Sequence, residues 1–600
     1  MTPLADLRAL LAALERAGEI VRVTAEVDPR LEIAEIHRRV IAAGGPALWF
    51  QQVKGSPWPL VTNLFGSRRR IELAFGTAPE RLAHALADAP RTLVPPSLGR
   101  LWRARALLAS LVRVGTREVR RAPVLEQIDT PPQLGRLPLL TCWPEDGGAF
   151  VTLPLVMTEH PAGLGSNLGM YRIQRHGEDQ VGLHVQIGKG GGFHLAAWEE
   201  RGQPMPVAIQ VGGPPAAILA AIAPLPENVP ELLLASLVRQ ERLRLARCAA
   251  SPLPLLAEAE VALLGLVRPG ERRDEGPFGD HYGYYSLRHP FPCVRVHALA
   301  RRRDPILCAT VVGKPRQEDF FLGDYLQELL APFVRLAMPS VRSLWSYGET
   351  GYHSLAAAIV HERYRREAMQ SAFRILGEGQ LSLTKFLLVT DRAVDLRDFR
   401  ATLAHVLART RLETDLYVFG NLAMDTLDYT GPGLNEGSKG VLLGLGDPVR
   451  DLPGQFQGTL PQGFRSAAPF CPGCLCVDGP AYAAEPLAAA RLAACSEFLP
   501  WPLLVLVDDA TQTAASPIRF LWNVFTRFEP AADLHTRAER IVRQHISHSG
   551  PLVIDARTKP SYPKELFADP ATKALVSRRW REYFPAGMEM GDSDTAHLGP

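Results

Sequence analysis

Long apolar runs and a strong net charge are both missing from this 600-residue chain. No run approaches the roughly 20 apolar residues that a membrane-spanning helix needs, so no transmembrane segment is expected. A net charge of +3 gives no basic footprint of the kind that nucleic-acid-binding proteins carry. Near the N-terminus, acidic residues are interspersed with arginine and no apolar signal region exists, which argues against a targeting peptide. These absences predict a cytoplasmic protein that does not bind nucleic acid.

Cysteine and lysine are also scarce, with eight residues of each. Cys471, Cys474 and Cys476 lie close together, but the second Cys or His pair of a zinc site is missing nearby. A Pro-Gly turn that leads into an apolar strand with reduced thiols is therefore the favoured interpretation. Because lysine is so rare, Lys189 and Lys439 stand out in their Gly-rich loops.

The chain is long enough for two to four domains, and its 46% hydrophobic and 22% charged residues are ordinary for a globular protein. Helical leucine spacing near the N-terminus and short apolar runs after it indicate an α/β domain over residues 1–125. Gly- and Pro-punctuated strand patterns with a helical insertion follow over residues 126–315. Helix and strand then alternate over residues 316–455 and 456–600, where residues 354–376 are expected to be one long helix. The predicted class is a multidomain α/β and α+β protein.

The last two segments share a pattern at one constant offset. Eight identities recur 118 residues apart without a gap, which suggests a duplicated strand–Asp–helix unit. Coincidence between two ordinary βα units is the alternative, since such units share apolar patterning. The first members of the eight pairs are Leu388, Val389, Asp391, Leu403, Val406, Arg409, Asp415 and Leu416.

Three segments in the middle of the chain carry residues suited to chemistry. Asn167 and Arg172 lie five apart, and an Asn oxygen binds hard cations while Arg holds carboxylate or phosphate in bidentate fashion. The Gly-rich turn around Lys189 could cradle phosphate through backbone N–H groups, or be a plain hairpin turn. Glu275 and Asp280 flank a Gly-Pro-x-Gly turn, which could bring the two carboxyl groups together. Two carboxyl groups held close acquire different proton affinities, so one can act as an acid while the other stays ionised. An acidic surface turn is the alternative for that pair, although the flanking aromatic residues indicate a partly enclosed pocket.

In this order, these segments resemble the UbiD family of reversible decarboxylases. The resemblance spans nearly all of about the first 440 residues, and the Glu-Gly-Pro-x-Gly-Asp stretch at 275–280 is its most specific part. It implies an N-terminal α/β domain, a central split β-barrel like that of flavin reductases, and a C-terminal α/β domain used in homo-oligomers, dimers or hexamers. Long members of about 600 residues carry an extra C-terminal α/β portion, in keeping with the repeated pattern.

The resemblance also implies a cofactor and its ligands. Family members use prenylated FMN, supplied by a separate flavin prenyltransferase, with Mn²⁺ (or Mg²⁺) and often K⁺. Asn167 and Glu231 match the metal ligands, and the carbonyl groups of Ala220 and Ala221 match a K⁺ site. Many members have a His ligand where this chain has Gly188, so His194 is an alternative ligand. The matching cofactor contacts are Met170, Tyr171, Arg172, His184, Val185, Gln186, Lys189, Gly190 and Lys439.

By resemblance, Arg172, Glu275 and Asp280 form the chemical network. Loss of CO₂ leaves an electron pair that side chains cannot accept, so a cofactor must accept it. A carboxylic acid then protonates the carbon; Glu275 and Asp280 are both candidates, and Asp280 is favoured because the phenolic-acid branch also has Asp there. The expected substrate is an aromatic acid, such as a hydroxybenzoate or naphthoate quinone precursor, or an α,β-unsaturated acid.

Two other classes of protein stay open. A flavin oxidoreductase would use ordinary FMN on the same split barrel. A catalytically silent scaffold would keep the fold and lose the network, but all three network residues are present in this chain. The glycine at position 188 is the one feature that favours the scaffold.

Overall fold

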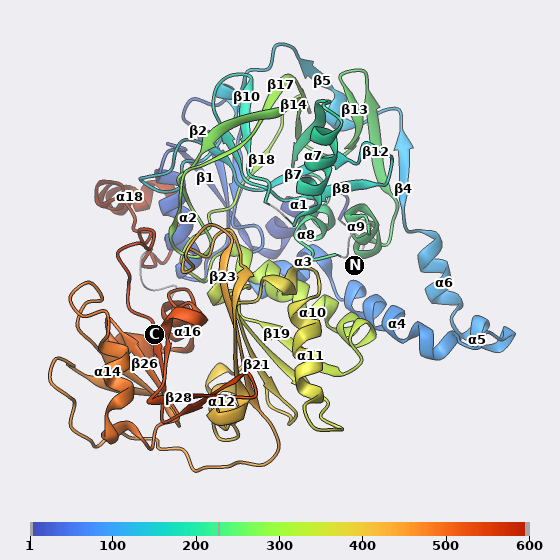
Figure 1. Cartoon of the computed structure of the whole chain (residues 1–600). Coiled ribbons are helices and arrows are strands. Elements are labelled where there is room, and N and C mark those ends of the chain that lie inside the picture. The colour runs from blue at the N-terminus through green and yellow to red at the C-terminus, as the bar shows by residue number, and fades with distance from the viewer. Residues whose placement is uncertain (1–3, 187, 226–228, 594–600) are drawn as a thin grey trace. The chain divides into compact units, whose positions relative to one another are not determined.

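The computed structural model describes residues 4–186, 188–225 and 229–593, which form two compact units (Figure 1). Of the described residues, those up to Leu329 and those from Glu565 onward form unit 1, and Leu330–Lys564 form unit 2. The expected last segment, residues 456–600, is therefore divided between the units. Among the described residues, no helix is long and apolar enough to cross a membrane.

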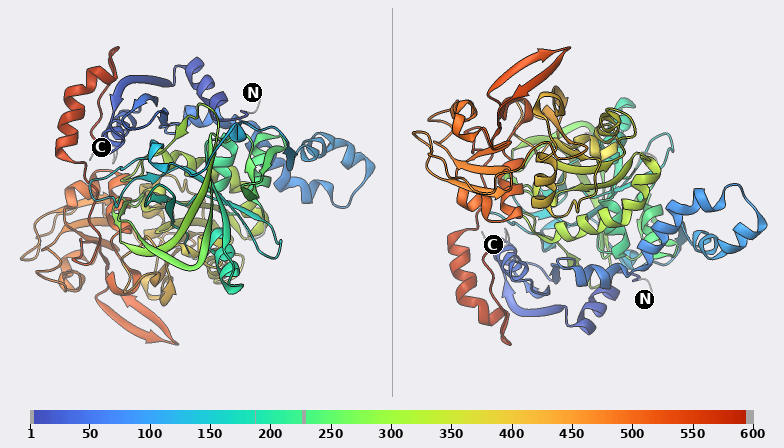
Figure 2. Two further views of the ribbon diagram at one scale, coloured as in Figure 1. Left: turned by 90° about the horizontal axis from the view of Figure 1, so that it is seen from above. Right: turned by 90° about the horizontal axis from the view of Figure 1, so that it is seen from below.

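The N-terminal part of unit 1 is the expected α/β layer. Helix α1 (Leu7–Ala17) buries its leucines, begins where Asp6 accepts a 2.9 Å hydrogen bond from the Ala9 N–H, and ends at Gly18 with φ 70°. Its sheet has the order β1-β2-β3-β18, formed by Ile20–Val27, Ala47–Val53, Leu60–Thr62 and Leu307–Cys308. The further helices are α2 (Glu32–Ala42), α3 (Arg68–Phe75), α4 (Ala78–Leu93), α5 (Leu98–Arg103) and α6 (Arg105–Val112). Helices α5 and α6 have no buried residue, and both views of Figure 2 show them, in light blue, projecting from the rest of unit 1.

A nine-stranded sheet forms the centre of unit 1. Its order is β6-β9-β10-β17-β14-β11-β7-β8, with β5 beside β17; this path is open, and no closed barrel occurs within the part of the chain that the structure describes. The long strands β14 (Val261–Glu275) and β17 (His289–Arg301) pair along its middle. The other strands are β5 (Gln127–Asp129), β6 (Phe150–Val151), β7 (Pro154–Glu159), β8 (Ser166–Gly169), β9 (Ile173–Arg175), β10 (Gln180–Leu183) and β11 (Met205–Val211).

Smaller elements surround this sheet. Strands β4 (Thr116–Val119), β12 (Leu243–Cys248) and β13 (Ser251–Leu256) make a separate sheet, and β15 (Phe278–Gly279) pairs with β16 (Tyr285–Ser286). Helices α7 (Gly190–Glu200), α8 (Pro215–Ala221) and α9 (Glu231–Arg239) supply the expected helical insertion, and α10 (Glu318–Ala337) leads into unit 2.

Unit 2 contains two five-stranded sheets with the same topology. Their orders are β19-β20-β21-β23-β22 and β24-β25-β26-β30-β27; in each, the outer pairs are antiparallel and the two middle pairs parallel. The first comprises Val341–Ser346, Leu355–Val360, Phe386–Thr390, Glu436–Gly444 and Leu416–Ala423. The second comprises Ala467–Cys471, Cys474–Asp478, Leu503–Val507, Leu552–Asp555 and Leu534–His535. Helices α12 (Phe399–Leu407) and α16 (Pro517–Phe525) fall at the same 118-residue offset that the sequence shows.

One expectation for this region is wrong. Residues 354–376 form strand β20 (Leu355–Val360) followed by helix α11 (Glu367–Leu376), and not a single helix. Strand β20 lies inside its sheet and is buried throughout. Its sequence is therefore apolar at every position and lacks the alternation of apolar and polar residues that would distinguish a strand from a helix.

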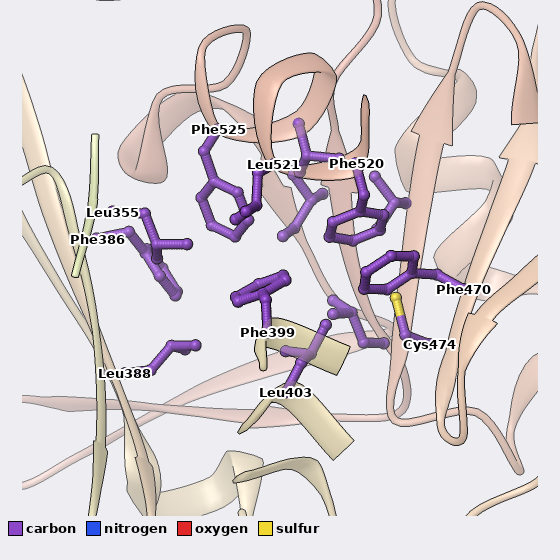
Figure 3. Packing of buried hydrophobic residues seen from close by; sticks show 14 of the residues in the cluster. Leu355, Phe386, Leu388, Phe399, Leu403, Phe470, Cys474, Phe520, Leu521 and Phe525 are labelled. Atoms are coloured by element: carbon purple, nitrogen blue, oxygen red, sulfur yellow. The ribbon is translucent and has the colours of Figure 1, made fainter. Parts of the chain in front are cut away.

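An aromatic core joins the two halves of unit 2 (Figure 3). The Phe399 ring of α12 lies 6.0 Å from the ring of Phe470 on β24 and 5.9 Å from each of the rings of Phe520 and Phe525 on α16. The thiols of the Cys cluster are free and buried on β24 and β25, and all three residues belong to this core. Their position at a strand pairing agrees with the favoured interpretation of a turn and strand.

Truncation of Phe399 tests whether this core holds the halves of unit 2 together. We expect Phe399→Ala to lower the free energy of unfolding of unit 2 by about 3–5 kcal/mol, because it opens a cavity between α12 and α16. Phe399→Leu, which keeps most of the apolar volume, is expected to lose about half as much or less. Hydrogen exchange of the β21 and β26 amides measures the effect; similar protection in both variants and wild type would contradict this packing.

Candidate active site

The three expected network residues come together in unit 1, at the point where strand β14 of the central sheet ends. Arg172 lies between β8 and β9, and Glu275 is the last residue of β14. Asp280 follows β15 directly, after the Gly-Pro turn has reversed the chain. All three side chains are buried, so the acidic surface turn considered from the sequence is excluded.

Arg172 binds both carboxylates. Its Nε and Nη2 donate to Oε1 and Oε2 of Glu275 at 2.8 and 2.9 Å, and its Nη1 donates to Oδ2 of Asp280. Nη2 also donates to the Ser286 hydroxyl at 2.9 Å. The ring of Phe278 lies 4.8 Å from the guanidinium carbon. One guanidinium therefore bridges two buried carboxylates beside an aromatic ring.

The electrostatics keep both acids ionised. Burial pushes the pKa of Glu275 upward, but the charge of Arg172 and the hydrogen bonds from His184 and Arg172 outweigh it and lower the pKa to about 2. Burial also opposes ionisation of Asp280, whose pKa nevertheless lies well below its usual range because of the His281 hydrogen bond and charge and the charge of Arg172. The three groups therefore carry a net charge of about −1 at neutral pH.

Two histidines flank the carboxylates. His184 Nδ1 lies 3.0 Å from Oε2 of Glu275, and His281 Nδ1 lies 2.6 Å from Oδ1 of Asp280. Burial, together with the charge of Arg172, lowers the pKa of His184, so its ring is neutral and its Nδ1–H donates to the carboxylate. His184 Nε2 is then a buried acceptor with no hydrogen-bond partner among the described residues.

Sequence reasoning missed two residues that support the network. Ser286 accepts a 3.2 Å hydrogen bond from the Phe278 N–H besides its bond from Arg172. Asp146 accepts backbone N–H bonds from Cys142 and Trp143 at 2.8 and 2.9 Å, and from Gly279 at 2.8 Å. Asp146 thereby links the turn at residues 142–146 to Gly279, the residue before Asp280. The only sequence signal was an Asp in a Pro-containing turn, which is common in loops.

The Gly-rich segment packs against Asn167 and Tyr171. The Tyr171 hydroxyl accepts a 3.1 Å bond from the Gly191 N–H and lies 3.4 Å from Asn167 Nδ2. A Cβ atom on Gly190 would lie only 2.2 Å from Asn167 Oδ1. Glycine is thus required for close approach, and the first turn of α7 is brought up to the Asn167 side chain.

Glu231 and His194 each contact a neighbour of Asn167. Glu231 Oε2 accepts a 2.9 Å bond from the Leu168 N–H, and burial raises the pKa of this carboxyl group. His194 Nδ1 lies 2.9 Å from the hydroxyl of Thr158, which faces Asn167 across the β7–β8 pair. Burial first, and then His160, lower the pKa of His194 to about 4. No group of three or more His, Cys, Asp or Glu suited to a metal occurs among the described residues.

The remaining expected contact residues divide between the two units. Met170 donates its N–H to the carbonyl of Ala221 at 3.2 Å, which joins the Arg172 turn to α8. Val185, Gln186 and Lys189 belong to the segment between β10 and α7. Lys439 lies on β23 of unit 2, where its Nζ donates to the Thr384 carbonyl at 2.9 Å and burial lowers its pKa to about 8.

Comparison with known proteins shows the family. Residues 11–89, 117–315 and 320–444 match the N-terminal, Rift-related and C-terminal domains of the family described as 3-octaprenyl-4-hydroxybenzoate carboxy-lyase. The chain belongs to this family, the UbiD carboxy-lyases. The matched domains end at residue 444, before the second sheet of unit 2.

Full-length relatives come from chlamydiae. An uncharacterized protein of Chlamydia trachomatis is 49% identical over 97% of this chain and 100% of its own length. A protein of Chlamydia pneumoniae, named as one of the subunits of a 4-hydroxybenzoate decarboxylase, is 48% identical over 96% of this chain and 98% of its own length.

Solved structures superpose on about three quarters of this chain. The vanillic acid decarboxylase of Sedimentibacter hydroxybenzoicus, in closed form, superposes with a TM-score of 0.66 and 25% identity over 76% of this chain and 95% of that chain. The UbiD-class enzyme HmfF from Pelotomaculum thermopropionicum, solved with FMN, superposes with a TM-score of 0.61 and 27% identity over 76% of this chain and 98% of that chain.

A methyl group at position 190 tests the close approach of α7 to Asn167. We expect Gly190→Ala to displace the Asn167 oxygen and, in the presence of FMN, to weaken the binding of Mn²⁺ by roughly 10- to 100-fold. A loss of this size is typical when a residue that supports a metal ligand is changed. Gly177→Ala is the control, since a Cβ there meets nothing within 4 Å. Calorimetric titration with Mn²⁺ measures the affinity; equal affinities for the two variants would show that Asn167 does not bind the cation.

Proposed function

We propose that this chain is a reversible decarboxylase of an aromatic carboxylic acid, of the hydroxybenzoate or naphthoate kind, that uses prenylated FMN and a divalent cation. The observation that carries the proposal is that the Arg172 guanidinium binds two buried carboxylates, Glu275 and Asp280, beside the Gly-rich start of helix α7. A silent scaffold would have no reason to bury two ionised acids around one guanidinium, because such an arrangement costs desolvation energy.

The residues present fit a flavin mononucleotide. His184 Nε2 is a buried acceptor with no hydrogen-bond partner in the described part of the chain, so it could bind the polar edge of a flavin ring. The glycines at the start of α7 leave its first backbone N–H groups close to Asn167, where a phosphate would meet the positive end of the helix. The residues of unit 1 that would hold the cofactor are Met170, Tyr171, Arg172, His184, Val185, Gln186, Lys189 and Gly190. A separate flavin prenyltransferase would supply it.

The oxygen donors beside the Gly-rich segment suit a hard cation. Asn167 and Glu231 would bind Mn²⁺ or Mg²⁺, and phosphate oxygens and water would complete the shell. His194 would serve as a ligand only if its ring left Thr158. The carbonyl groups of Ala220 and Ala221 would hold K⁺; that of Ala221 accepts the Met170 N–H and has a second lone pair to offer.

The bound flavin supplies the electron sink that loss of CO₂ requires. Arg172 would orient the substrate carboxylate while it holds Glu275 in place. A third carboxylate beside one guanidinium raises the proton affinity of the neighbouring acids, so Asp280 would take up a proton and pass it to the carbon that CO₂ leaves. Glu275, bonded to Arg172 in bidentate fashion and to His184, would stay ionised. Phe278 and Phe291, the latter 4.1 Å from the His184 ring, would exclude water.

The names of relatives support the substrate class. Vanillic acid and 4-hydroxybenzoate, named for two of them, are both phenolic acids, and this chain carries Asp at position 280. Two finer features of the fold belong to the same proposal. The central sheet would correspond to the split barrel of the family, and unit 2 would derive from a duplication, supported by its two sheets of equal topology. A homo-oligomer is proposed by family resemblance.

Turnover is tested by co-expression with a flavin prenyltransferase and a panel of hydroxybenzoates and naphthoates. In D₂O, the loaded protein is expected to incorporate deuterium at the carbon that carried the carboxylate, and bound prenylated FMN is identified by mass. Ordinary FMN with reduction of a substrate would establish the oxidoreductase instead, and a protein that binds no flavin would be a scaffold.

Isosteric variants test the two carboxylates. We expect Glu275→Gln and Asp280→Asn each to lower turnover by roughly 10²-fold or more, as for a lost acid–base group, with flavin retained. The double variant should be little worse than the worse single variant, because the groups act as one unit. Asp274→Asn, at the exposed neighbour of Glu275, is the matched control with near-normal turnover. Turnover within a few-fold of wild type in both single variants would contradict the assigned network.

A further inference from the structure

A short C-terminal segment pairs with the turn that carries Asp280. Where the chain re-enters unit 1, Glu565 forms an isolated antiparallel bridge with Tyr284. The Leu566 N–H donates to the Gly283 carbonyl at 3.0 Å. We call Glu565, Leu566 and Phe567 the C-terminal strap. It lies beyond the domains matched to the family, which end at residue 444.

The strap completes a hydrogen-bonded turn. The Asp280 N–H donates to the Tyr284 carbonyl at 3.1 Å, and the Gly283 N–H donates to the Asp280 carbonyl at 2.9 Å. Gly283 is therefore held through its N–H by Asp280 and through its carbonyl by Leu566. Because Gly283 has φ 83°, a conformation that glycine adopts without strain, the bond from Leu566 restrains a residue whose backbone is intrinsically permissive.

The strap itself is firmly anchored. Leu566 is fully buried, and the Glu565 carboxylate pairs with Lys314 Nζ at 2.6 Å. Lys314 is also buried, and its ammonium lies 3.9 Å from the ring centre of Phe567. The buried Lys314 ammonium, paired with the partly exposed Glu565 carboxylate, therefore favours the strap in this position.

A helix fastens the chain beyond the strap. Helix α18 (Pro570–Tyr583) packs on α2, where Arg579 pairs with Glu32 at 2.6 Å. Further along, the Ser593 hydroxyl donates to Glu35 at 2.8 Å. The strap is thus held at both of its ends within unit 1: by Lys314 at its start and by α18 after it.

Asp280 consequently sits between two supports. On one side Asp146 accepts the Gly279 N–H, and on the other the strap holds Gly283. We infer that the C-terminal strap is a positioning element for Asp280, keeping its carboxylate on Arg172; this rests on the proposed role of Asp280 as proton donor. The last segment of the chain thereby supports an acidic network whose other members lie within residues 146–286.

Two substitutions at one position isolate the strap bond. Leu566→Pro removes the donor N–H, whereas Leu566→Ala removes more of the buried side chain but keeps the N–H. In the full-length protein, we expect the Asp280 and Gly283 amides to exchange with solvent roughly tenfold faster in the Pro variant than in the Ala variant, because only the former frees the turn. Exchange in the β14–β17 pair should be the same in both, which checks that unit 1 stays folded.

Kinetics of the flavin-loaded variants provide the second measurement. We expect kcat of Leu566→Pro to fall on the order of 10²-fold below that of Leu566→Ala, as for a misplaced catalytic group, with KM changed little because Arg172 keeps its bidentate bond to Glu275. Glu565→Gln, which removes the charge that pairs with Lys314, should lie between them.

Equal exchange at Asp280 and Gly283 in the Pro and Ala variants would overturn the inference, and so would equal kcat. If the wild type decarboxylates no acid, the proposed function fails. The exchange experiment, which needs neither substrate nor flavin, still decides whether the strap holds the turn.

Discussion

The guanidinium of Arg172, shared between Glu275 and Asp280, is the interaction on which the site depends. It is bidentate to one carboxylate and bound to the other, and all three groups are buried. Two ionised acids in an apolar environment would repel each other strongly without it. Strand β14 delivers Glu275, the turn after β8 delivers Arg172, and the cis Gly276–Pro277 turn delivers Asp280. Much of unit 1 is the frame that keeps these three residues in contact.

The same frame makes the site suitable for a carboxylate substrate and an anionic cofactor. Glycines at the start of α7 allow close approach to Asn167, and His184 offers a buried acceptor beside Glu275. The acids are held by turns whose backbone is bonded to Asp146 and to the C-terminal strap. Rigid support matters because proton transfer is sensitive to small displacements of the donor.

Local patterns predicted much of this arrangement, and contacts between distant residues account for the rest. Leucine spacing predicted α1, and the five-residue spacing across Gly-Pro-x-Gly predicted that Glu275 and Asp280 would meet. The apolar residues of β20 were mistaken for helix because a strand buried on both faces has no alternation. The return of the chain at Glu565 was missed, since α18 packs on a helix more than 500 residues earlier. Asp146 was missed because its partners are backbone N–H groups, which carry no side-chain signal.

Proton uptake on binding of an aromatic carboxylate tests the central claim most directly. Titration of the flavin-loaded protein with benzoate, in two buffers of different ionisation enthalpy near neutral pH, measures the protons taken up per ligand bound. Because a third anion joins two ionised acids around Arg172, the account expects uptake of about one proton, which Asp280→Asn abolishes. Binding without proton uptake would contradict it, since Asp280 would then remain ionised with no proton to transfer.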